Sequence, residues 1–251
     1  MTASLRSLGG LARSLAVYRA RPWKIGRLAS FYAGFVRPGD LAFDVGAHVG
    51  NRTRALLRAG ARVVALEPQS LFHAFLRRDL PREVTLLPMA AGAREGEAEL
   101  AVSRLHPTVS SLAEGFADRM GGAPGFGRVR WDATETVEVI TLDALIAEFG
   151  RPRFVKIDVE GYEPEVLAGL STPVPWLAFE SLPGQPEAAQ ACVARLAGLG
   201  EHEFNLVDGE RGGFALRDWT GAAEIVGRLA ARGPRARPAD VYARWRDAPA
   251  G

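Results

Sequence analysis

The sequence predicts an α/β fold in which a mostly parallel sheet is covered by helices on both faces. Short apolar runs alternate with helical patterns along the chain, and glycine and proline separate them. The length of 251 residues suits one sizeable core, and neither an internal repeat nor a second domain is evident. We expect a basic helical arm at 1–38 and one domain at 39–251.

The elements follow in chain order. The first half is expected to hold strands at 41–46, 62–67 and 84–89 and helices at 51–60 and 70–79. An insertion near 97–140 contains two alternating segments, 97–102 and 136–141, which we expect to pair as half-exposed strands. The second half is expected to hold helices at 141–150, 164–169 and 186–199 and strands at 153–158, 175–180, 203–207 and 213–217.

Residues 121–127 of the insertion include four glycines in seven residues, which predicts a loop. We expect this loop and the basic arm to be mobile without substrate and to close over the site when substrate binds.

Composition excludes several classes of protein. Cys192 is the only cysteine, so neither an internal disulfide nor a cysteine-based metal cage can form. Apolar runs stay shorter than the roughly 18 residues that a membrane span requires, and arginines interrupt the N-terminus where a secretory signal would be apolar. A cytoplasmic location is therefore expected, whereas the oligomeric state stays open.

The charge of the N-terminus is uneven. No acid precedes Asp40, although Arg6, Arg13, Arg19, Arg21, Lys24, Arg27 and Arg37 all do. The arm is expected to be a solvated helix packed beside the core, and peripheral contact with a membrane or an anionic substrate is the alternative. Nucleic acid is not expected as a partner, because neither aromatic–basic interleaving nor zinc-finger spacing occurs.

The segment FDVGAHVGN, residues 43–51, predicts a ligand-binding turn at the end of the first strand. Gly46 lets the chain turn sharply, and Gly50 is expected to let a ligand approach the backbone. The spacing matches neither the dinucleotide fingerprint G-x-G-x-x-G nor a P-loop. Both phosphate-binding interpretations are therefore weakened.

Two acids at strand ends indicate a different ligand. Asp44 would repel a pyrophosphate but suits a cation such as an ammonium group, and Glu67 at the end of the next strand can accept both hydroxyls of a ribose. Together they predict S-adenosylmethionine as the cofactor. The expected contacts around this turn are Asp44, Gly46, Ala47, His48, Gly50, Asn51 and Glu67.

The motifs FDVGAHVGN, VVALEPQ, TLDALI and FVKIDVEGYEPEVLAGL, in this order over roughly residues 36–180, resemble the FkbM family of S-adenosylmethionine-dependent methyltransferases. The closing segment ADVYARW resembles the end of that family. The resemblance implies a class I methyltransferase fold, a Rossmann-like three-layer sandwich with a seven-stranded sheet. It also implies methyl transfer to a hydroxyl oxygen, often on a sugar or a natural product. Arg52 and Thr53 depart from the family's usual residues.

The same fold usually meets the adenine ring after the third strand, where Ala90 leaves room for it. The reacting end is expected at the next strands. Lys156, Asp158 and Glu160 alternate and so begin on one face, and Glu180 ends the following strand. Asp158 or Glu180 is the candidate base for a substrate hydroxyl. Lys156 either orients a carboxylate, stabilises an oxyanion, or forms a structural ion pair with Asp158.

Several alternatives stay open. Asp158 and Glu180 could hold Mg²⁺, but a third ligand is not evident, so a metal is not favoured. Among the histidines, His48 is a candidate cofactor contact and His106 a candidate substrate contact, whereas His73 and His202 are expected at the surface. A nicotinamide-dependent oxidoreductase shares the fold but requires the absent glycine pattern, and a non-catalytic cofactor-binding module is the third class.

Overall fold

In the computed structural model of the chain, strands and helices alternate as predicted over the described residues 5–19, 23–106, 110–113, 129–209, 212–233 and 236–248. The loop at 121–127, which we expect to close over the site, lies outside these residues.

The main elements keep the predicted order. The helices are α1 (Leu5–Arg19), α2 (Trp23–Tyr32), α3 (Asn51–Arg58), α4 (Ser70–Asp79), α6 (Leu142–Phe149), α7 (Glu163–Ala168), α8 (Pro186–Leu199) and α9 (Ala222–Ala230). The strands are β1 (Leu41–Val45), β2 (Arg62–Leu66), β3 (Thr85–Leu87), β4 (Met89–Ala91), β5 (Gly96–Val102), β6 (Ala133–Ile140), β7 (Phe154–Ile157), β8 (Trp176–Ser181), β9 (His202–Asp208) and β10 (Ala239–Trp245).

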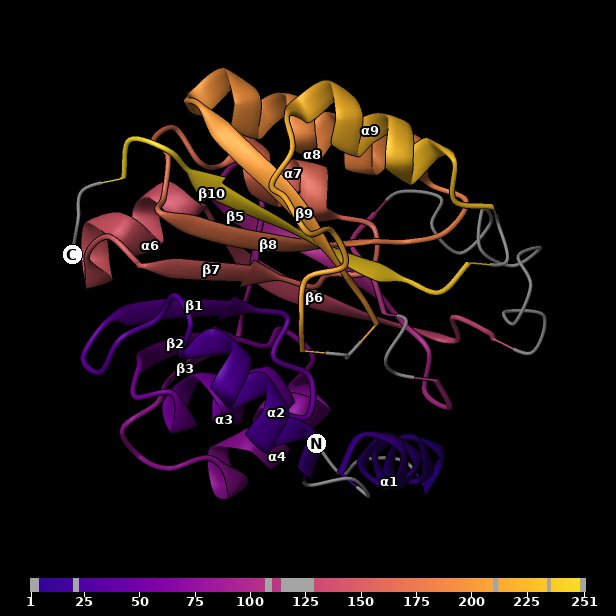
Figure 1. Cartoon of the computed structure of the whole chain (residues 1–251). Coiled ribbons are helices and arrows are strands. Elements are labelled where there is room, and N and C mark those ends of the chain that lie inside the picture. The colour runs from indigo at the N-terminus through magenta and orange to yellow at the C-terminus, as the bar shows by residue number, and fades with distance from the viewer. Residues whose placement is uncertain are drawn as a thin grey trace.

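Seven strands form the central sheet in the order β3-β2-β1-β7-β8-β10-β9. Neighbouring strands from β3 to β8 pair in parallel, and β10 is antiparallel to both β8 and β9. Helices lie on both faces, so the fold has three layers (Figure 1). The predicted mostly parallel, seven-stranded α/β sandwich is confirmed.

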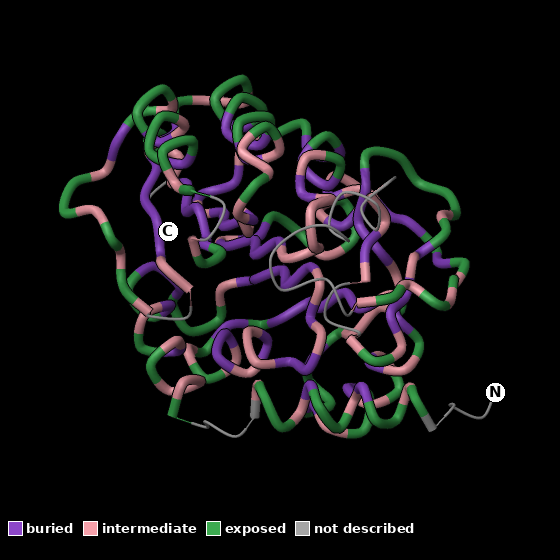
Figure 2. Tube along the Cα trace, turned by 90° about the vertical axis from the view of Figure 1, so that its right-hand side faces the viewer, coloured by how far each residue is buried: buried purple, intermediate pink, exposed green. Residues whose placement is uncertain are grey.

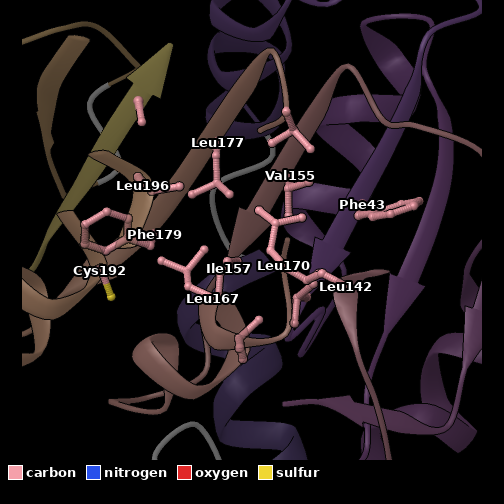
Figure 3. Close-up of a cluster of buried hydrophobic side chains, with 14 of the residues drawn as sticks. Phe43, Leu142, Val155, Ile157, Leu167, Leu170, Leu177, Phe179, Cys192 and Leu196 are labelled. Carbon is pink, nitrogen blue, oxygen red and sulfur yellow. The ribbon is translucent and has the colours of Figure 1, made fainter. Parts of the chain in front are cut away.

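Alternation along β1 separates the two faces of the sheet. Phe43 and Val45 belong to a core cluster with side chains of α6, α7, α8 and α9, and Cys192 is buried in it (Figure 3). Ala42 belongs to the opposite cluster, which α2, α3 and α4 cover. Asp44 shares the side of Ala42, so its carboxylate points toward α3 rather than toward α7.

The arm contributes to this second face. Tyr32 of α2 is fully buried, and its ring lies 5.3 Å from that of Phe154 on β7. Helix α1 packs beside α4. Within the described residues, no helix has the length and hydropathy to cross a membrane.

The predicted strand at 84–89 divides into two. β3 joins the central sheet, whereas β4 pairs in parallel with β6 in a small sheet of order β4-β6-β5. Pro88 stands between them and has no N–H to donate, which ends the first ladder. The predicted pairing inside the insertion is confirmed, because β5 and β6 are antiparallel.

One prediction for the last third is wrong, and one helix was missed. Residues 213–217 form bends rather than a strand, and the sheet position next to β9 is taken by β10. Helix α9 was not predicted, although it buries Ile225 and Leu229 in the core. Gly212 and Gly213 before the bends do not favour an extended ladder.

Candidate active site

A cavity of about 380 Å³ opens at the carboxyl ends of the parallel strands. The predicted site residues on its wall are Gly46, Ala47, His48, Asn51, Glu67, Ala90, Asp158 and Glu180. Tyr18 of α1 and Ser110–Leu112 of the insertion also line it. Ligands of open α/β sheets bind at this edge, and the volume suits a cofactor-sized molecule.

Gly46 is required by the approach of two chain segments. Its φ is 87°, and a Cβ atom added to it would lie 1.9 Å from the carbonyl oxygen of Asp158. The turn after β1 therefore lies directly against the end of β7. The sharp turn predicted at Gly46 is present, and glycine is needed both for the conformation and for the contact.

Gly50 has a different role from the one we predicted. Its φ is 80°, but a Cβ there would meet Leu76 of α4 at 2.9 Å, and the residue is buried away from the cavity. Gly50 thus permits packing between helices rather than the approach of a ligand. Asn51 does line the cavity, and its side-chain amide donates to the carbonyl of Tyr18 in the arm.

Glu67 closes the turn after β1 from the neighbouring strand. Its two carboxylate oxygens accept the backbone N–H groups of His48 at 2.7 Å and Gln69 at 2.9 Å. Burial raises the pKa of Glu67 to about 8, although both hydrogen bonds oppose the shift. Each oxygen retains a further lone pair, so a ribose diol remains within its accepting capacity.

Asp44 lies below the cavity rather than on its wall. The side chain is fully buried and its Oδ2 accepts a hydrogen bond from the Thr53 hydroxyl of α3. Burial raises the pKa of Asp44, and the hydrogen bond from Thr53 opposes the rise. Direct contact between Asp44 and a cationic ligand, as we predicted, does not agree with this geometry, because Asp44 points to the α3 side of the sheet.

His48 and Glu160 are the non-glycine residues with positive φ in the described part of the chain, at 49° and 54°. They stand in the turns after β1 and β7, and both line the cavity. Such backbone conformations are costly and cluster at functional sites. The ring of His48 lies 4.4 Å from that of Phe72 and 5.1 Å from that of Tyr18, and burial lowers its pKa to about 4.

Lys156 lies behind the cavity wall and not on it. Its ammonium group, which is fully buried, donates to the Ile157 carbonyl and to Asp240 Oδ1, each at 2.9 Å. Asp158 Oδ2 lies 3.7 Å away. Of the roles left open for Lys156, the structure supports the structural ion pair, with Asp240 as the nearer carboxylate.

Arg52, at the start of α3, completes this charge network. One guanidinium nitrogen contacts Asp158 at 3.2 Å and Asp240 at 3.0 Å. Burial opposes the charge of Asp158, yet the cations Lys156 and Arg52 hold its pKa below the ordinary value. Asp158 is therefore a carboxylate that stays ionised.

A third acid joins the pair predicted at the reacting end. Asp158, Glu160 and Glu180 each offer a carboxylate oxygen, and these oxygens lie within 4.8 Å of one another. A third candidate ligand was not evident from the sequence, and the turn after β7 supplies one by bringing Glu160 back. Burial and the charge of Asp158 raise the pKa of both Glu160 and Glu180 well above the ordinary value.

The remaining histidines lie outside the cavity. His106 contacts Arg13 of α1 at 2.9 Å, which joins the insertion to the arm, and it is not on the cavity wall. His73 is half-buried. His202 was expected at the surface but is buried at the start of β9, with Nδ1 2.9 Å from the Gly200 carbonyl.

Sequence reasoning missed contributions from distant segments. Tyr18 comes from the arm, and Asp240 comes from ADVYARW, which we took only as the end of a family pattern. Arg52 was recognised as a departure from that pattern but was given no role. An acid that opens an alternating apolar segment near the C-terminus was the available signal for Asp240.

The site fits a polar cofactor. Four residues on the cavity wall each carry a buried polar atom that lacks a hydrogen-bond partner within the described part of the chain: His48 Nε2, Asn51 Oδ1, Arg52 Nε and Glu180 Oε2. Buried polar groups normally have partners, so these atoms suit a ligand with donors and acceptors. Together with the sheet order and the ribose-type acid Glu67, they define a class I methyltransferase site.

The family model "Methyltransferase FkbM domain" matches residues 44–233. The chain therefore belongs to the FkbM family of S-adenosylmethionine-dependent methyltransferases, as its motifs predicted.

One curated protein is similar to part of the chain at low sequence identity. The hexuronic acid methyltransferase AglP of Haloferax volcanii is 26% identical over 135 residues, which cover 53% of this chain and 50% of that protein. The chain thus spans about half the length of this curated relative.

Two solved structures align with the chain. A TehB-like S-adenosylmethionine-dependent methyltransferase from Corynebacterium glutamicum covers 88% of each chain at 8% identity and a TM-score of 0.45. The precorrin-6y C5,15-methyltransferase from Geobacter metallireducens covers 90% of this chain and 87% of its own, at 14% identity and a TM-score of 0.41.

Proposed function

We propose that the protein transfers a methyl group from S-adenosylmethionine to a hydroxyl oxygen of a sugar or another small acceptor. The observation that carries this proposal is the position of the acid trio Asp158, Glu160 and Glu180. The trio lines the same cavity as Glu67. In the sheet order, β2 with Glu67 lies on one side of β1, and β7 and β8 with the trio lie on the other.

In this proposal, different residues on the cavity wall bind different parts of the cofactor and the acceptor. Glu67 accepts the ribose hydroxyls, and Ala90 beside Met89 leaves space for the adenine ring. S-adenosylmethionine supplies the methyl group and a positive sulfonium. Asp158 and its neighbours provide negative charge for that cation and acceptors for the acceptor hydroxyl.

Glu180 is the proton acceptor that the geometry favours. Asp158 is already bound by Arg52 and Lys156, which makes it a weak base. Glu180 Oε2 is buried without a partner within the described residues, and its raised pKa gives it a strong affinity for a proton. The positive sulfonium of bound S-adenosylmethionine would favour the ionised form of Glu180. Loss of that positive charge on methyl transfer would favour uptake of the hydroxyl proton by Glu180.

An acidic sugar is the acceptor class that has support. The relative AglP is named for hexuronic acid, which carries a carboxylate. Arg237 is exposed on the cavity wall, where its guanidinium suits an anionic acceptor.

A nucleic acid partner is not proposed. We propose the cytoplasm as the location, in line with the expectation from the sequence.

The test is transfer of a labelled methyl group to uronic-acid and neutral glycans, followed by alkaline hydrolysis. The expected product is a methyl ether, which survives alkali. A methyl ester on the carboxylate, which alkali cleaves, would replace the proposal with methylation of an acid. Absence of transfer to any acceptor, despite cofactor binding, would favour a non-catalytic module.

Variants test the assigned roles in the same assay. Glu180→Gln and Asp158→Asn should each lower turnover about 10²-fold or more and keep cofactor affinity within a few-fold. Glu203→Gln is the matched control, since Glu203 pairs with Arg244 away from the cavity and should leave turnover unchanged. EDTA separates proton transfer from metal activation, because it silences the wild type only if the acid trio works through a cation.

A further inference from the structure

The exposed large apolar side chains of the described residues gather in one region. They are Leu8, Val17, Trp23 and Leu105, with exposed fractions of 47, 56, 63 and 50%. The first three belong to α1 and α2, and Leu105 precedes His106, which contacts Arg13 of α1. Exposed apolar side chains that cluster in this way mark an interaction surface.

The same surface is basic. Residues 1–39 contain no acid, and Arg6 and Arg13 are exposed on α1. The helices beneath add Arg58 of α3 and Arg77 and Arg78 of α4. The acid of α4, Asp79, is paired with Arg54.

Helix α1 is two-sided. Gly10 and Ser14 are buried, and Tyr18 lines the cavity, so this side faces the protein. Arg6, Leu8 and Val17 are among its exposed residues, and the helix runs along one edge of the molecule (Figure 2). Leu8 and Val17 stand nine positions apart, so they border the exposed side of α1 at its two opposite edges, and Trp23 begins α2. Exposed aliphatic, tryptophan and arginine side chains on adjoining helices are typical of interfacial segments.

We propose that α1 and the start of α2 dock the protein onto an anionic lipid surface. Leu8, Val17 and Trp23 enter the headgroup region, and the arginines meet the lipid phosphates. A second copy of the chain fits less well, because a two-fold contact between the acid-free helices α1 and α2 would oppose like charges.

Docking would place the cavity beside the membrane. Tyr18 joins α1 to the cavity wall, and Asn51 in the cofactor turn donates to the Tyr18 carbonyl. An acceptor carried on a lipid would then reach the cavity from the docked side, a step that rests on the proposed function. The docking itself does not depend on the acceptor.

Co-sedimentation of the full chain with vesicles tests the docking without any acceptor. We expect binding to phosphatidylcholine vesicles that contain phosphatidylglycerol, little binding to phosphatidylcholine alone, and release at high salt. The variant Leu8→Ser/Val17→Ser/Trp23→Ser should bind at least about ten-fold more weakly. Arg6→Glu should bind about five-fold more weakly or worse.

Arg94→Glu is the matched charge control, because Arg94 is exposed in the turn between β4 and β5. It should bind vesicles like the wild type. Unchanged binding of S-adenosylhomocysteine shows that each variant is folded. Wild type that ignores anionic vesicles, an arm variant that binds as well as Arg94→Glu, or a dimer that buries Trp23 would each overturn the docking proposal.

Discussion

Asp240→Asn is expected to destabilise the protein strongly although it keeps the shape of the side chain. Lys156 is fully buried, and its ammonium group donates to Asp240 at 2.9 Å. Arg52 contacts both Asp240 and Asp158, so two cations face two carboxylates. The substitution removes one negative charge and leaves a net positive charge inside the protein.

The expected cost follows from burial. Removal of one partner of a buried ion pair costs about 3–5 kcal/mol, because the other charge stays buried without compensation. Asp158 is 3.7 Å from the ammonium group and already serves Arg52, so it replaces Asp240 only in part. For a chain of this size the loss corresponds to a decrease in Tm of roughly 6–20 °C.

Thermal and urea unfolding, followed by circular dichroism, measure the loss in the free energy of unfolding. The variant Asp208→Asn is the matched control. Asp208 lies next to β10 at the end of β9 and pairs with Arg232, with exposed fractions of 39% and 24%. A partly exposed pair contributes about 0–1 kcal/mol. If Asp240→Asn costs no more than Asp208→Asn, the network does not hold Lys156 as described. Lys156→Met/Asp240→Leu, which removes both charges, should regain much of the stability.

Three further outcomes are expected. Glu67→Ala should weaken S-adenosylhomocysteine binding by about 1–3 kcal/mol in calorimetry, while NAD stays unbound by the wild type; tight NAD binding would contradict the site. Gly46→Ala should abolish cofactor binding or folding, since its Cβ would lie 1.9 Å from the Asp158 carbonyl oxygen, and normal melting and binding would refute this. Without ligand, Glu67 and Glu163 should make stability fall as pH rises toward 8, because burial raises the pKa of Glu67 to about 8 and of Glu163 to about 7, whereas His48, with its pKa lowered to about 4, opposes this slope below about 6.5. The folded state keeps protons that the unfolded state has released in that window, and Glu67→Gln should flatten the slope.

Local patterns were sufficient for most of the sheet. The buried strands at 41–46 and 153–158 show as apolar runs, and the helix at 70–79 has the predicted bounds. Helix α9 was missed because Gly221, Gly227 and Gly233 resemble loop signals. Burial of Ile225 and Leu229 in the core stabilises this helix, and the local sequence does not reveal that tertiary contact.

The turn after β1 and its place on the cavity wall could be predicted because glycine spacing and strand-end acids are adjacent in sequence. The direction in which each strand-end acid points could not be predicted from the sequence. The Asp44 side chain points to α3, whereas the Glu67 side chain faces the turn after β1. The ion-pair partner of Lys156 could not be predicted from the sequence either. Asp240 lies 84 positions further along the chain and meets Lys156 only because β10 inserts between β8 and β9.

Arg52 explains how a departure from the family pattern is accommodated. It follows the cofactor turn directly, and its guanidinium contacts Asp158 at the end of β7 and Asp240 on β10. The start of α3, directly after the turn that follows β1, is thus fixed to the carboxylate beside the proposed proton acceptor. Burial raises the pKa of Glu180, and the charge of Asp158, which Arg52 and Lys156 keep ionised, raises it further. The cations that keep Asp158 ionised therefore contribute, after burial, to the raised pKa of the proposed proton acceptor.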